Sequence, residues 1–129
     1  MELSVGLKSR IVEEVIDDST ALSIGSGSLP VFATPKMVAL MEKASCKAIE
    51  AALNEGLTSV GTLVNVEHLS ATPKGMKVTV ESVVTAVDKR KVCFEVVAFD
   101  EAGIIGKGTH ERFIVDSERF LAKTNAKLQ

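Results

Sequence analysis

The sequence contains no tryptophan and no tyrosine, and only five of its 129 residues are phenylalanine. Proteins that hold single-stranded nucleic acid stack its bases on aromatic side chains, so this mode of recognition is poorly supported. The charge balance agrees, because 15 basic and 17 acidic residues give a formal net charge of −2 and hence no global positive field. We therefore expect no nucleic-acid partner and no binding to an anionic membrane surface.

Cysteine is also scarce. Cys46 and Cys93 lie far apart in the sequence, with no CxxC motif and no neighbouring histidine pair. This pattern argues against a disulfide framework and a structural zinc site, so we expect no metal, no cofactor and buried thiols in a reducing compartment. Apolar runs of the roughly 20 residues that a membrane span needs are missing, and the N-terminus lacks the apolar core of a secretory signal. The sequence thus predicts a soluble, cytoplasmic protein.

Hydrophobic residues, in contrast, are plentiful. They make up 46% of the chain, against 25% charged residues, which predicts a single globular domain over residues 1–129 without repeats or linkers. Residues 17–33 are rich in Asp, Ser and Gly, and we expect a lid or crossing loop there. The hydrophobic periodicity predicts a helix over 35–54, a short helix or frayed end over 116–129, and strands over 5–16, 57–72, 76–88, 91–100 and 104–115.

Turn-forming residues separate the last four predicted strands. Pro73-Lys74-Gly75, Asp88-Lys89-Arg90 and the segment 100–103 are typical of tight turns, so we expect successive strands to pair antiparallel as a meander. One long helix followed by consecutive strands does not fit a doubly wound sheet, which alternates helices and strands. The sequence therefore predicts an α+β fold in which an antiparallel curved sheet wraps around one long central helix.

The ends of the central helix have clear signals. Thr34 is a favourable cap, Pro35 suits the first turn, and Gly56 supplies a stop. On a helical wheel, one solvent-facing side collects four charged residues and the remainder is nearly all apolar; the four are Lys36, Lys43, Lys47 and Glu50.

Glu42 is the one charged residue inside the apolar arc of this helix, between Ile49 and Leu53. A buried carboxylate without a partner costs several kcal/mol, so this position implies a partner, a raised pKa, or both. A structural ion pair and a functional carboxylate are both consistent with it.

His68 is the second anomaly, because strand alternation from Val60 through Val64 places it at the end of an otherwise apolar row. It is either a satisfied core histidine or a catalytic one, and together the two residues suggest acid–base chemistry.

Two further features accompany Glu42 and His68. The N-terminus of the helix at Thr34 presents free N–H groups that can hold an anion or a carbonyl oxygen. In the last strand, Gly106 and Gly108 alternate and are followed on the same face by His110 and Arg112. The missing side chains either let the sheet bend around the helix, or let another backbone or a ligand approach closely.

Several short motifs, taken in order, resemble the fluoroacetyl-CoA thioesterase group of hotdog-fold proteins. The likeness runs from about residue 31 to residue 127, and its motifs are Val31-Phe32-Ala33-Thr34, Met37-Val38, Leu40-Met41-Glu42, Gly61-Thr62, Val66-x-His68, Ala71-Thr72-Pro73 and Gly106-x-Gly108-Thr109-His110-Glu111-Arg112. The resemblance implies a hotdog fold whose protomers pair edge to edge, as a homodimer or a dimer of dimers, with acyl-CoA sites along the interface.

The resemblance also implies roles for individual residues. Thr34, Glu42 and His68 match the catalytic threonine, glutamate and histidine of that group, and Gly61 and Arg112 match positions near its acyl pocket. The expected activity is hydrolysis of a short-chain acyl-CoA, with Glu42 acting as a nucleophile or as a base toward water. The alternatives are an acyl-CoA-binding hotdog domain without chemistry and a hotdog enoyl-CoA hydratase. The family's aromatic-rich lid is replaced here by the segment 27–30, Gly-Ser-Leu-Pro, so selectivity for fluoroacetyl-CoA is not implied.

Overall fold

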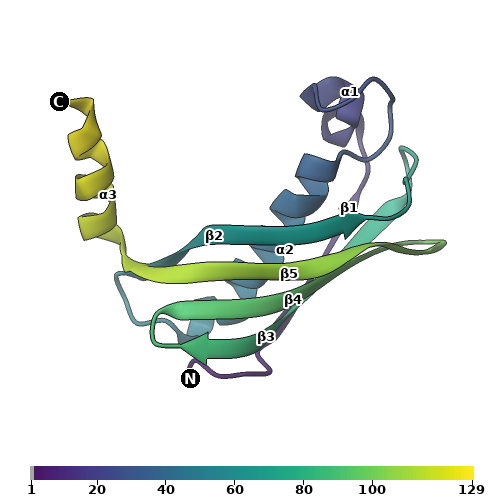
Figure 1. The fold of residues 1–129 in the computed structure, drawn as a ribbon. Coiled ribbons are helices and arrows are strands. Elements are labelled where there is room, and N and C mark those ends of the chain that lie inside the picture. Colours follow the sequence, from purple (N-terminus) through teal and green to yellow (C-terminus); the bar gives the residue numbers. More distant parts are fainter. Residues whose placement is uncertain (1) are drawn as a thin grey trace.

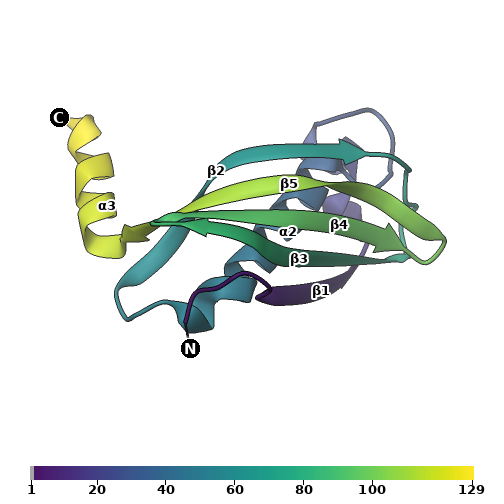
Figure 2. The ribbon, with the colours of Figure 1, turned by 60° about the horizontal axis from the view of Figure 1, so that its bottom comes forward.

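A five-stranded antiparallel sheet curves around one long helix in the computed structural model, which describes residues 2–129 (Figures 1 and 2). The predicted α+β architecture is thereby confirmed. In chain order the elements are β1 Lys8–Glu14, a 3-10 turn Asp17–Ser19, α1 Ala21–Ile24, α2 Thr34–Ile49 with a following 3-10 turn Glu50–Ala52, β2 Leu57–His68, β3 Lys77–Asp88, β4 Lys91–Asp100, β5 Gly103–Asp116, α3 Ser117–Asn125 and a last 3-10 turn Ala126–Leu128.

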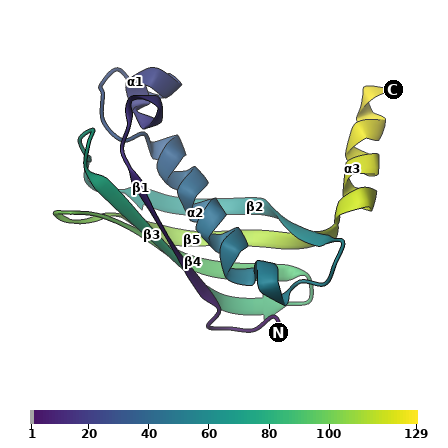
Figure 3. The same ribbon diagram turned by 180° about the vertical axis from the view of Figure 1, so that it is seen from behind.

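The central helix α2 lies across the concave face of the sheet, and its apolar arc forms the core together with the facing strands (Figure 3). Met37, Leu40, Met41 and Ile49 are fully buried and pack in one cluster with Phe94 of β4. The charged side points outward as predicted.

That charged side is tied to the edge strand β1. Lys36 and Lys43 both reach the carboxylate of Glu13, at 3.6 and 3.7 Å. These exposed pairs contribute little to stability.

The helix begins one residue earlier than predicted, and Thr34 is not its cap. Ala33 occupies the cap position without a side-chain hydrogen bond, and Thr34 is the first helical residue, ahead of Pro35. The hydroxyl of Thr34 is therefore free to bond elsewhere.

The strand order β1-β3-β4-β5-β2 contradicts the predicted meander at one point. The hairpins at 89–90 and 101–102 pair β3 with β4 and β4 with β5, as expected. However, β2 pairs with β5 and not with β3, so residues 69–76 cross from one side of the sheet toward the other. Pro73 and Gly75 do lie in a turn, but a connection of this length does not impose hairpin pairing as a two-residue loop does. As a result, β2 is an edge strand.

Gly106 and Gly108 of β5 make room for neighbouring protein. A Cβ at Gly106 would lie 2.8 Å from Cε of Met37 on α2, and a Cβ at Gly108 would collide with the backbone of Asn65 and Val66 on β2. Of the two interpretations that the sequence left open, close packing of helix and strand therefore explains these glycines.

Residues 17–33 form the crossing segment that was predicted, but with short helical turns in place of an irregular loop. The helix α1 is capped by Thr20, whose hydroxyl accepts from the N–H of Ser23, and it ends at Gly25 in the left-handed conformation. Two isolated bridges hold the segment over the N-terminus of α2, pairing Thr20 with Phe32 and Val31 with Pro73.

Within residues 2–129, none of the helices has the length and apolar character needed to cross a bilayer.

Candidate active site

Glu42 and Arg112 form an ion pair between α2 and β5. Nη1 of Arg112 lies 3.3 Å from Oε2 of Glu42, and the exposed fractions of the two side chains are 7% and 41%. The carboxylate is thus held by a buried cation and open to solvent on its other side. This pair supplies the partner that the position of Glu42 on the helical wheel required.

Gly61 of β2 lies directly against this carboxylate. A Cβ at this position would sit 2.6 Å from Oε2 of Glu42 and 3.2 Å from Nη1 of Arg112. A side chain here would displace the carboxylate, so the glycine is what allows Glu42 to lie against the backbone of β2.

The guanidinium of Arg112 is fixed from the opposite side by Ser59 of β2. Nε donates to the hydroxyl of Ser59 at 2.8 Å, and Nη2 donates to its carbonyl oxygen at 3.0 Å. Nη1 also lies 3.2 Å from Nε2 of His110, a fully buried residue whose ring stacks on Phe94. Four contacts therefore orient one planar group, as suits a cation that must stay in register with a carboxylate.

A β-bulge places these residues on the helix-facing side of the sheet. The pairing of β2 with β5 shifts between Gly61 and Leu63, so the side-chain alternation changes phase at Thr62. The predicted single row of β2 side chains is therefore wrong before the bulge: Gly61 faces the helix, and Val60 and Thr62 do not share the face of Val64. Alternation alone does not reveal a bulge.

Thr34 and His68 form a second pair, at the N-terminus of α2. Oγ1 of Thr34 lies 2.7 Å from Nδ1 of His68, and Phe32 approaches the imidazole edge-on with ring centroids 6.3 Å apart. Burial lowers the pKa of His68 below its ordinary value, an effect that the backbone of Ser70 partly opposes. Nε2 of His68 is buried and, within residues 2–129, has no hydrogen-bond partner.

Within one protomer, the two pairs lie apart. Thr34 and Glu42 are eight residues apart on α2, a rise of about 12 Å at 1.5 Å per residue, and no hydrogen bond in the described part of the chain joins Glu42 to Thr34 or His68. The structure therefore brings Glu42 together with Gly61 and Arg112, and Thr34 together with His68, but it does not unite the three predicted catalytic residues in a single chain.

A hollow of about 270 Å³ adjoins the Thr34–His68 pair, beneath α1. Phe32, Val31 and Ala71 supply part of its apolar lining.

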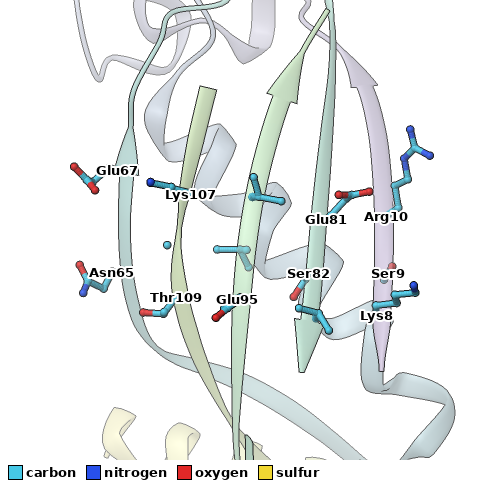
Figure 4. Close-up of a pocket in the computed structure, with 14 residues that line it drawn as sticks. Lys8, Ser9, Arg10, Asn65, Glu67, Glu81, Ser82, Glu95, Lys107 and Thr109 are labelled. Carbon is cyan, nitrogen blue, oxygen red and sulfur yellow. The ribbon is translucent and has the colours of Figure 1, made fainter. Parts of the chain in front are cut away.

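A larger hollow of about 940 Å³ lies on the opposite face of the sheet (Figure 4), where α2 passes behind the strands. Its charged side chains come from all five strands; they are Lys8, Arg10, Glu67, Glu81, Glu95 and Lys107. Because no histidine lines it among residues 2–129 and none of the predicted catalytic residues reaches it, size alone does not identify the site.

Ser59 and His110 are the members of the site that sequence reasoning missed. His110 was placed on the face of Arg112 by strand alternation, but no role followed from that placement. Ser59 gave no signal, because a serine within a strand is unremarkable until its partner from β5 is known. Clusters of three or more His, Cys, Asp or Glu arranged to hold a metal ion are absent from the part of the chain that the structure describes.

Comparison with known proteins identifies the family of this chain. The family model for the fluoroacetyl-CoA-specific thioesterase (FlK) matches residues 15–118. The chain belongs to the fluoroacetyl-CoA-specific thioesterase family. This membership confirms the resemblance seen in the sequence and the predicted enzyme class, a thioester hydrolase.

Individual relatives of the fluoroacetyl-CoA-specific thioesterase family agree. A fluoroacetyl-CoA thioesterase from Streptantibioticus cattleyicolor is 43% identical over 97 residues, which are 75% of this chain and 70% of the relative. A solved structure of the fluoroacetyl-CoA thioesterase FlK superposes with a TM-score of 0.92 at 34% identity and covers 98% of both chains. A thioesterase superfamily member from Thermus thermophilus superposes with a TM-score of 0.88 at 30% identity, over 95% of this chain and 91% of its own. The fold is the hotdog fold.

Proposed function

We propose that this protein hydrolyses short-chain acyl-CoA thioesters, with Glu42, Thr34 and His68 as its catalytic residues and Gly61 and Arg112 as substrate-binding residues. The observation that carries the proposal is the half-exposed carboxylate of Glu42, held by buried Arg112 against the backbone of Gly61. A carboxylate fixed in this way, with one side open, is suited to attack a carbonyl carbon or to take a proton from water.

The chemistry balances by either of two routes. In the first, a carboxylate oxygen of Glu42 bonds to the thioester carbon and the C–S bond breaks; water then cleaves the resulting anhydride, which frees the acid and restores the Glu42 carboxylate. In the second, Glu42 takes a proton from water as the water oxygen bonds to the thioester carbon, and the C–S bond then breaks to release the acid. Thr34 orients His68. In both routes the sulfur leaves as a thiolate, and His68 relays to it the proton that the water gives up. The hollow of about 270 Å³ beside this pair lies below the usual range for drug-sized ligands, which favours a small acyl group.

Glu42 and His68 lie too far apart within one chain to act on the same thioester, so a second copy of the chain is needed to complete the site. β2 is hydrogen-bonded on one side only, by β5, and its exposed residues include Leu63 and Val64, which are 45% and 41% exposed. An open edge of this kind is a ready site for another strand. Antiparallel pairing of two β2 edges about a two-fold axis near residues 64–65 would set Gly61 opposite the partner's His68. We propose that each site of the homodimer combines Glu42 of one protomer with Thr34 and His68 of its partner.

Thiol release from a panel of acyl-CoAs tests the activity. Acetyl-, fluoroacetyl-, butyryl- and benzoyl-CoA should show release that favours the small acyl groups, and Glu42→Gln should reduce kcat by at least a hundredfold. A protein that binds acyl-CoA without releasing thiol would be a binding domain. With crotonyl-CoA as an added substrate, a change in enoyl absorbance without thiol release would identify a hydratase. Either outcome would refute the proposed hydrolysis.

Subunit complementation tests the composite site. Glu42→Gln and His68→Asn homodimers should each be inactive. After equal amounts are mixed and allowed to exchange subunits, mixed dimers carry one intact site of two, so about a quarter of the sites should become active. A site contained in one protomer predicts no recovery. Native mass spectrometry of the same mixture, with one variant carrying an affinity tag that changes its mass, measures the extent of subunit exchange.

A further inference from the structure

His110 contacts the Glu42–Arg112 pair through the guanidinium of Arg112. Arg112 Nη1 has two acceptors, Oε2 of Glu42 at 3.3 Å and Nε2 of His110 at 3.2 Å. A guanidinium only donates hydrogen bonds, so Nε2 of His110 must offer a lone pair. Because Nη1 carries two hydrogens, it can donate one N–H to His110 and the other to Glu42.

The other ring nitrogen fixes the tautomer. Nδ1 of His110 lies 2.7 Å from the carbonyl oxygen of Leu63, which only accepts, so the proton is on Nδ1 and the ring is neutral. Burial lowers the pKa of His110 below its ordinary value, and the charge of Arg112 lowers it further; the Leu63 carbonyl, Glu42 and Glu111 act in the opposite direction. Leu63 is the residue at which the β2 bulge ends, so the imidazole of His110 links this bulge to the guanidinium of Arg112.

We propose that His110 is a positioning residue that shares Nη1 of Arg112 with Glu42 and thereby keeps the Glu42 carboxylate within reach of the thioester. The proposal rests on the hydrolytic function proposed above. Without the acceptor on His110, one N–H of Nη1 would be buried without a partner, and the guanidinium would be free to turn from its present orientation. The Glu42 carboxylate, which is held through the other N–H, would then lose its fixed position against Gly61 and be less reactive toward a carbonyl.

Two substitutions of His110 separate its nitrogens. The amide oxygen of His110→Gln takes the place of Nε2 and keeps an acceptor for Arg112, whereas the amide of His110→Asn takes the place of Nδ1 and keeps only the contact with Leu63. We expect His110→Gln to retain kcat within about threefold. His110→Asn should lower kcat by roughly tenfold to a hundredfold, the effect of one hydrogen bond to a charged group, with KM changed less than about threefold. Thr109→Val, on the opposite face of β5, is the control.

A double variant tests whether His110 acts through Arg112. In an Arg112→Lys background, which lacks the planar fork, His110→Asn should add less than about a twofold further loss. Equal losses in His110→Gln and His110→Asn would overturn the proposal. So would a fully additive double variant, or retention of kcat by His110→Asn.

A measurement that needs no substrate keeps the two proposals distinguishable. Imidazole ¹⁵N shifts of the wild-type protein at pH 7 should show His110 as the neutral tautomer with the proton on Nδ1. A proton on Nε2 would overturn the role of His110 whether or not thioesters are hydrolysed. Absence of thiol release by the wild-type protein, with the expected tautomer present, would refute the proposed function while leaving the contact with Arg112 in place.

Discussion

Gly61→Ala is the sharpest perturbation of the site that the structure offers. The backbone of Gly61 does not have a positive φ, so alanine carries no conformational penalty there. Its Cβ would lie 2.6 Å from Oε2 of Glu42, whereas ordinary contact begins at 3.4 Å. The difference, 3.4 minus 2.6, requires the carboxylate to move by about 0.8 Å, and this half-exposed side chain has room to do so.

The expected magnitude follows from that displacement. A misplacement of about 1 Å in a reacting group costs roughly a hundredfold in rate, so we expect kcat/KM for the best acyl-CoA to fall by about that factor. Stability should change by less than about 1 kcal/mol, because the main displacement is that of a half-exposed carboxylate, the side chains of Arg112 and His110 must yield only slightly, and no backbone shifts. For a chain of this size, the melting temperature should therefore change by no more than about 4 °C.

Thiol release and thermal unfolding of the same preparations test Gly61→Ala. Gly108→Ala is the matched control, because its Cβ would collide with the backbone of Asn65 and Val66, which cannot yield as a side chain can. The control should lose stability, and its folded fraction should retain most of its kcat. If Gly61→Ala kept wild-type kcat/KM, or lost activity only in proportion to unfolding, the carboxylate would not be the reacting group.

Two further outcomes follow from the same contacts. Thr34→Val removes the hydroxyl that holds Nδ1 of His68 but does not remove a helix cap. We therefore expect kcat to fall roughly tenfold with little change in melting temperature. Thr34→Ser should restore activity, and equal loss in both variants would contradict this role. The folded-state pKa values of His68 and His110 are lowered, so the unfolded chain binds more protons, and stability should be full above about pH 6.5 and fall as pH drops toward those lowered values. The urea midpoint measured from pH 7.5 to 5.5 should show this decline, with a shallower slope in a His68→Asn/His110→Gln variant; equal slopes would refute the assignment.

Much of the candidate site could be located from the sequence. Glu42 interrupts an apolar helical arc, and His68 ends an apolar strand row, so each could be found from local periodicity. Alternation could place Arg112 on the same face of its strand as His110, but it could not tell that this face meets the helix. The pairing of Glu42 with Arg112 could not be predicted, because the two are 70 residues apart in the sequence and local pattern carries no information on which strand meets which helix face.

The sequence by itself determined the elements, because helix and strand periodicity, glycine stops and two-residue turns act within a few residues. It therefore predicted the central helix, the five strands and the α+β class. Tertiary structure decided that β2 pairs with β5 and the following connection crosses the sheet, that the chain bulges between Gly61 and Leu63, and that Thr34 bonds to His68 and does not cap the helix. These outcomes depend on contacts between distant segments, where packing of the whole core selects one arrangement among several that satisfy the local rules.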